Sequence, residues 1–137
     1  MVARNRIVAA SVPEPPPSTY ANGYIVGDTI YISGQHAGEA SGEIVGGDSV
    51  REQSARTLSK VQALVEAAGA TMADVVKITV YLTDIGRRAE FGDARRGFFR
   101  GDFPCSTLVG ISALALPGLL VEVEAIAVRG SGIPRGA

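Results

Sequence analysis

The stretch Leu119–Ala127, with the sequence LLVEVEAIA, decides how the fold of this chain is interpreted. Glu122 and Glu124 stand two residues apart in an otherwise apolar run with a high β propensity. In a strand, residues two apart point to the same face, so both carboxylates share one face. Two interpretations are open. Either this is an edge strand with its carboxylates in solvent, or the carboxylates are partly buried and need donors or a water to bind.

Outward from this stretch, the chain shows a succession of strand and helix patterns. Ser49 to Glu52 has the form of a capping box, and Gly69 follows the last residue of an apolar helical stripe. Gly27-Asp28 and Pro117-Gly118 are turn pairs between strand patterns. The expected helices are 50–68 and 87–100, and the expected strands are 4–9, 23–26, 29–34, 75–83, 105–112 and 119–129, with a further short strand at 44–45.

This order of elements predicts an α+β domain that spans residues 1–137, in which two helices pack on one face of a mixed sheet. The chain contains no third helix to cover the other face. Burying that face against further copies of the chain is the economical solution, and closed rings are the usual symmetry of such oligomers.

Composition excludes several classes of function. The net charge is −1, and no basic block exceeds two residues, so we expect neither nucleic-acid binding nor attraction to an anionic membrane. With one histidine, His36, and one cysteine, Cys105, a metal site is not expected. No apolar run reaches the length of a membrane span, and the N-terminus lacks the apolar core of a signal peptide. A cytoplasmic protein without a cofactor is the simplest expectation.

From Tyr20 to Ala127, the chain resembles the RidA/YjgF family of imine and enamine deaminases. Ser33-Gly34-Gln35 matches the family's Ser-Gly-Gln strand end, and the Pro104–Val109 and LLVEVEAIA stretches match its C-terminal motif. Two further segments, 65–69 and 75–84, are similar in sequence to the family. The resemblance implies a chorismate mutase-like fold, a homotrimer, and a small-molecule metabolite that binds in clefts between subunits.

The resemblance also implies roles for individual residues. Glu122 occupies the position of the glutamate that holds the attacking water, and Tyr20, Ser33 and Gly34 occupy positions in the wall of the substrate cleft. Glu124 is expected instead to pair with a buried donor across the sheet or an interface. His36 follows the Ser-Gly-Gln end and is either an acid–base group at the cleft rim or a surface histidine.

Three positions depart from the family pattern. Ser106 stands where the family has an arginine that pairs with the substrate carboxylate. Leu108 stands where a small polar residue or a cysteine is common, and Gly92 aligns with a family asparagine. The expected cleft is therefore more apolar and lacks its fixed cation, which makes amino-acid-derived imines poor substrates.

Alternatives to this function are open. Loss of the arginine also fits a trimeric small-molecule-binding protein without catalysis, and a ribonuclease activity, which has been attached to the family, is disfavoured by the absence of a basic patch. Cys105 is expected on the strand face opposite Ser106 and is not expected to be a nucleophile. The predicted second helix carries arginines that are expected to form a solvated face: Arg87, Arg88, Arg95, Arg96 and Arg100. The alternative is that one of these arginines, from a neighbouring subunit, enters the cleft and replaces the missing cation.

Overall fold

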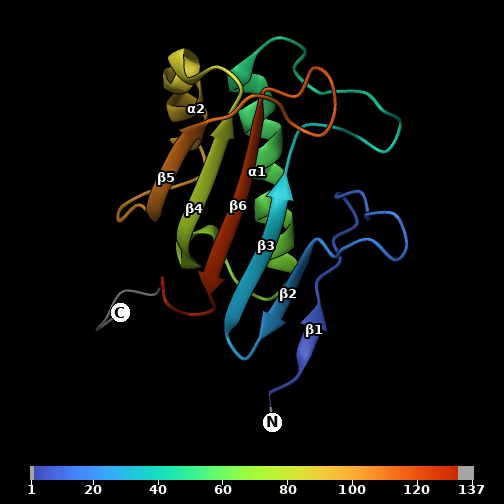
Figure 1. Ribbon diagram of the computed structural model, residues 1–137. Coiled ribbons are helices and arrows are strands. Elements are labelled where there is room, and N and C mark those ends of the chain that lie inside the picture. The colour runs from blue at the N-terminus through green and yellow to red at the C-terminus, as the bar shows by residue number, and fades with distance from the viewer. Residues whose placement is uncertain (1, 133–137) are drawn as a thin grey trace.

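Strand β6 (Val121–Val128) lies inside a six-stranded sheet in the computed structural model, which describes residues 2–132 (Figure 1). The strand order is β1-β2-β3-β6-β4-β5, so β6 is hydrogen-bonded on both sides. The edge-strand interpretation of the Glu122–Glu124 pair is therefore wrong. Alternating polar residues indicate that one sheet face is polar, but they do not reveal how many neighbouring strands are present.

The sheet is mixed, as predicted, because β4 and β5 run parallel while every other neighbouring pair is antiparallel. Two helices accompany it (Figure 1). The remaining bounds are β1 (Arg4–Arg6), β2 (Gly23–Val26), β3 (Thr29–Gln35), α1 (Val50–Ala67), β4 (Val75–Leu82), α2 (Arg88–Arg95) and β5 (Cys105–Gly110), with short 3₁₀ helices at Met72–Asp74 and Ile85–Arg87.

Helix α1 begins and ends within one residue of its predicted bounds. The side chain of Ser49 accepts a hydrogen bond from the backbone N–H of Glu52 at 3.1 Å, which caps the first turn. After the helix, Gly69 adopts a φ of +82°, a left-handed conformation that favours glycine. The apolar stripe of α1 is fully buried against the sheet and α2: Leu58, Val61, Leu64 and Val65.

The buried amide of Gln53 ties α1 to the start of β6. Its Nε2 donates to the carbonyl oxygens of Gly47 at 2.7 Å and Gly118 at 2.9 Å, and its Oε1 accepts from the N–H of Leu120 at 2.9 Å. All three bonds fix loop backbone that would otherwise lack partners in the interior. The entry of β6 into the sheet, and with it the position of Glu122, is thus set by α1.

The helices cover one sheet face, on which Ile78, Val80 and Val123 are fully buried. The opposite face bears alternating side chains that are less buried, among them Tyr31, which is 50% exposed. No helix within residues 2–132 packs on this second face, which is called the open face below. No helix of the described chain is long and apolar enough to cross a membrane.

Several predicted bounds were too long. The first strand stops at Arg6 because Ile7 turns into the core, and the predicted strand at 44–45 is only an isolated bridge between Gly38 and Ile44. The predicted helix 87–100 contains α2 alone, which ends at Arg95. The strand predicted at 105–112 ends at Gly110. The strand predicted at 119–129 begins only at Val121.

Candidate functional site

Glu122 lies on β6 beside Tyr81 of β4 and points to the open face. Its side chain is half-buried. Burial, followed by the nearby charge of Glu124, raises the pKa of the Glu122 carboxyl above its ordinary value. Among residues 2–132, no protein group donates a hydrogen bond to this carboxylate, so its oxygens are available to a water or a ligand.

Gly34 makes room for the Glu122 carboxylate. The pairing of β3 with β6 shifts register between Ile32 and Gln35, and this irregularity brings the Gly34 backbone against the glutamate. A Cβ atom at position 34 would lie 2.8 Å from Cδ of Glu122, closer than real Cβ contacts allow. A larger residue at this position would therefore displace the carboxylate from where it lies.

Glu124 has a different environment, although it shares the open face with Glu122. It accepts a hydrogen bond from the hydroxyl of Tyr81, on the neighbouring strand. That bond is the main reason why the pKa of the Tyr81 hydroxyl is raised. Glu124 is thus engaged by a donor across the sheet, whereas Glu122 is the carboxylate without a protein donor.

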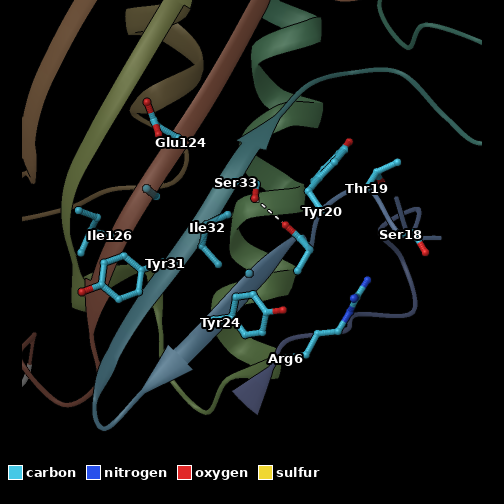
Figure 2. A pocket seen from close by; sticks show the side chains of 13 residues that line it. Arg6, Ser18, Thr19, Tyr20, Tyr24, Tyr31, Ile32, Ser33, Glu124 and Ile126 are labelled. Atoms are coloured by element: carbon cyan, nitrogen blue, oxygen red, sulfur yellow. Dashed lines mark hydrogen bonds between the residues drawn. The ribbon is translucent and has the colours of Figure 1, made fainter. Parts of the chain in front are cut away.

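A cavity of about 650 Å³ opens next to this pair, between the open face and the loop that precedes β2 (Figure 2). Figure 2 shows residues of β2, β3 and β6 along one side and the 18–20 segment along the other. Ser33 donates to the carbonyl oxygen of Ala21 at 2.6 Å, which holds this loop against β3. The polar lining includes Arg6, Tyr20, Tyr24, Tyr31, Ser33 and Glu124.

Five of the predicted site residues gather at this end of β3. Tyr20 and Ser33 line the large cavity, and Gly34 touches Glu122. His36 lines a second, smaller pocket of about 130 Å³ together with Tyr20 and Gly34. This cluster of Tyr20, Ser33, Gly34, His36 and Glu122 is called the glutamate half-site below.

The other three predicted residues lie elsewhere in the subunit. Ser106 pairs with Ile78 and Leu108 pairs with Val80, both of which point to the helix-covered face. Leu108 accordingly packs against the core, while Ser106 is exposed on edge strand β5 and Gly92 is half-buried on α2. We call Ser106, Leu108 and Gly92 the β5 half-site.

The two half-sites do not meet within one subunit. Ser106 is level with Ile78 on β4, whereas Glu122 is level with Tyr81, three residues further along the same strand. That offset is about 10 Å at the usual strand rise, and the two side chains also point to opposite sheet faces.

The arginines near α2 are partly used within the subunit. Arg87 pairs with Glu90 at 2.7 Å, and Arg96 pairs with Asp93 at 2.6 Å. The cysteine at position 105 is exposed, on the strand face opposite Ser106. Within residues 2–132, no group of three metal-ligating side chains is assembled.

Two polar residues of interest were not singled out from the sequence. Tyr81 holds Glu124, and the alternation along 75–83 already placed it on the polar strand face. Lys60 is only 2% exposed. It sits within the apolar stripe of α1, and a lysine at a core-facing helical position is the signal that could have identified it.

Comparison with known proteins agrees with this fold. Residues 12–129 match the profile of the endoribonuclease L-PSP family. A Bos taurus 2-iminobutanoate/2-iminopropanoate deaminase is 38% identical over 112 residues, covering 81% of this chain and 80% of that protein. A Pseudomonas aeruginosa protein of unknown function has a crystal structure with a TM-score of 0.84 and 38% identity, covering 95% of both chains. The E. coli protein TdcF, solved with bound serine, has a TM-score of 0.82 and 30% identity, covering 91% of this chain and 98% of that one.

Proposed function

Because the chain belongs to the endoribonuclease L-PSP family, also called RidA/YjgF, we propose that it is a hydrolase that deaminates a small imine or enamine, with Glu122 as the group that activates water. The observation that carries this proposal is the state of Glu122. It is a half-buried carboxylate on an inner strand, with a raised pKa, no protein donor in the described chain and a glycine beside it. A carboxylate in such a place is suited to hold and deprotonate a water molecule.

The chemistry requires one group that first accepts and then returns a proton. As the water oxygen attacks the carbon of the C=N bond, Glu122 takes a proton from the water. The resulting carbinolamine carries nitrogen and hydroxyl on the same carbon. Glu122 returns that proton to nitrogen. It then takes the hydroxyl proton as the carbonyl of the product forms and gives this second proton to the departing nitrogen, so that the C–N bond breaks and ammonia leaves. The raised pKa of Glu122 suits both halves of this exchange, because a catalytic group works best when its pKa approaches the working pH.

We further propose that the protein assembles as a homotrimer that joins the two half-sites. The β5 half-site lies at one edge of the sheet, whereas Glu122 lies on the inner strand β6 and points to the open face. Contact between two different surfaces of identical chains is head-to-tail, and such contacts form a ring when the rotation between neighbouring subunits closes. A ring would cover the open face of each subunit and set Ser106 of one copy near Glu122 of the next.

The substrate follows from the residue at position 106. The named substrates of the bovine relative carry a carboxylate, and TdcF binds serine, which also has one. Serine at position 106 offers a neutral hydroxyl, which does not reproduce a bidentate guanidinium–carboxylate contact. We therefore propose that this protein prefers a neutral imine or enamine. The name of the matched family suggests endoribonuclease activity, but the net charge of −1 and the paired arginines near α2 do not favour an RNA-binding surface.

The experiment that tests catalysis is a turnover assay of wild type, Glu122→Gln and Glu124→Gln on a panel of imines and enamines. For a hydrolase, Glu122→Gln lowers kcat by about 10²–10⁴ while the fold and assembly are kept. Glu124→Gln affects stability more than rate. Equal ligand binding by wild type and Glu122→Gln, with no turnover by either, would instead support a non-catalytic binding protein, which the loss of the arginine at position 106 also fits.

A further inference from the structure

Lys60 is a buried ammonium group whose hydrogen-bonding capacity the described chain does not fill. The residue is 2% exposed on α1, and its Nζ donates one hydrogen bond, at 2.6 Å, to the carbonyl oxygen of Gly38. An ammonium group has three donors, so two remain. Within residues 2–132, no carboxylate lies within ion-pair distance of Nζ. A buried charge without a counter-ion is costly.

The acids that face this region are already committed to other cations. Glu39 is held by Arg56, with Nε–Oε1 at 2.6 Å and Nη2–Oε2 at 3.2 Å. Glu14 is held by Arg6 at 2.7 Å. Each of these two carboxylates therefore forms an ion pair with an arginine, and neither forms one with Lys60.

His36 adds a second donor to the same place. Its Nδ1 accepts a hydrogen bond from the backbone N–H of Gly38 at 3.0 Å, so in the neutral ring the proton resides on Nε2. Burial and the charge of Lys60 lower the pKa of His36, against an opposing effect of Glu39, which favours this neutral form. Burial is likewise the main reason why the pKa of Lys60 is lowered, with Glu39 acting in the opposite direction.

Both donors line the pocket of about 130 Å³ between the 13–16 loop, the end of β3 and α1. At about 30 Å³ per water molecule, this volume suits a ligand of four to six heavy atoms. The ligand should be a hydrogen-bond acceptor with one negative charge, since Lys60 and His36 line the pocket and the two carboxylates that also line it, Glu14 and Glu39, are paired with arginines. A compact monocarboxylate has these properties.

We propose that this pocket is a binding site for a small monocarboxylate of two or three carbons, held by Lys60 Nζ and His36 Nε2. The site shares His36 with the glutamate half-site but does not include Glu122, since Lys60 lies on the helix that covers one sheet face and Glu122 points to the opposite face. Tyr20 lines both the small pocket and the larger cavity, so a ligand in the small pocket would lie next to the wall of the larger cavity. The proposal does not depend on Glu122 being catalytic.

The chain contains two lysines, Lys60 and Lys77, which makes a direct test possible. The intact protein is labelled with ¹³C at lysine Cε and titrated with sodium acetate or sodium pyruvate, and with acetamide as the uncharged analogue of acetate. The Lys77→Met variant identifies the two resonances and removes the same charge from an exposed position. We expect the Lys60 resonance to shift with a dissociation constant on the order of millimolar, suited to so small a ligand, while acetamide has no effect.

Calorimetry on variants provides the second readout. Lys60→Met is expected to weaken acetate binding at least about tenfold, which corresponds to roughly 1.4 kcal/mol, whereas Lys77→Met binds as wild type does. His36→Phe, which removes the second donor without touching the lysine, weakens binding less. The proposal is overturned if the Lys60 resonance does not move at tens of millimolar acetate, or if it moves equally with acetamide. If Lys60→Met does not fold, the resonance shift and His36→Phe decide the question.

Discussion

The carboxylate of Glu122 occupies the space that a side chain at position 34 would need, so Gly34 and Glu122 are matched to each other across the β3–β6 pair. Gly34 leaves room for the glutamate in this position, and both carboxylate oxygens remain available for a water molecule.

Gly34→Ala is therefore expected to displace the Glu122 side chain and lower kcat/KM by about 10²-fold, the effect of a misplacement of roughly 1 Å. Steady-state kinetics measures this change. Gly97→Ala is the control, since a Cβ there meets its nearest atom at 3.4 Å in an exposed turn. Full activity of Gly34→Ala would show that the glutamate has no fixed position to lose.

Removing the hydroxyl that holds Glu124 should separate stability from catalysis. In Tyr81→Phe, the half-buried Glu124 loses its donor, and we expect a cost of about 1–3 kcal/mol in unfolding free energy with less than about a tenfold change in kcat. Chemical denaturation measures the first quantity. Ser41→Ala, which removes an exposed hydroxyl from the loop at 38–47, should change neither. A loss of activity in Tyr81→Phe as large as that in Glu122→Gln would place Tyr81 in the reaction itself.

Restoring the cation at position 106 should broaden the range of substrates. Ser106 is exposed, so Ser106→Arg is expected to fold. Its guanidinium should raise kcat/KM on 2-iminopropanoate by about tenfold or more. Ser106→Lys should raise it less, because an ammonium group cannot form the bidentate contact. Wild-type activity on this substrate that already equals that of Ser106→Arg would show that a different group binds the carboxylate.

The raised pKa of Glu122 predicts two opposite effects of pH. The reaction needs the ionised carboxylate, so kcat/KM should fall about tenfold per pH unit once the pH drops below the pKa of Glu122. Because this pKa is raised, the fall should begin at a higher pH than the pKa of an ordinary glutamate. Stability changes in the other direction, since the folded protein binds this proton more tightly than the unfolded chain. The unfolding free energy of wild type should therefore decrease relative to Glu122→Gln as the pH rises from the ordinary carboxyl range through the pKa of Glu122. A difference between the two proteins that does not depend on pH would contradict this account.

Assembly is tested by light scattering at micromolar concentration. A trimer is expected, because the open face has no cover within the described chain and the half-sites require partners. A charge placed on this face by Ile126→Asp should shift the equilibrium towards monomers and abolish activity, while Glu43→Lys, on the exposed 38–47 loop, should not. A stable, active wild-type monomer would exclude a shared site.

Much of the fold was predictable from the sequence, because local signals agree with the tertiary structure. Ser49 and Gly69 bound α1 as caps do, and the alternation along β4 gave its two faces correctly. The position of β6 inside the sheet was not predictable from periodicity, since the same alternation describes a strand with one neighbour or two. The end of α2 was missed because the helical spacing of Phe91, Ala94 and Phe98 continues beyond Arg95, where the helix stops.

The site was predictable only in part. Resemblance to a family supplied Glu122 and Gly34 as positions, but their contact depends on a local irregularity in β3 that has no sequence pattern of its own. The separation of Ser106 from Glu122 follows from which strands are neighbours, which periodicity does not reveal. Lys60 was overlooked because a lysine in a helix is ordinarily exposed.

The separation of Glu122 on an inner strand from Ser106 on an edge strand has a consequence for mixtures of variant chains. Suppose that each active site contains Glu122 of one chain and Ser106 of another. A variant inactivated only at Glu122 and a variant inactivated only on β5 can then restore activity when they are refolded together. Some centres in such a mixture receive both intact halves, while either variant alone has none. The loss of activity caused by a substitution in one chain would then depend on the sequences of the other chains in the same oligomer.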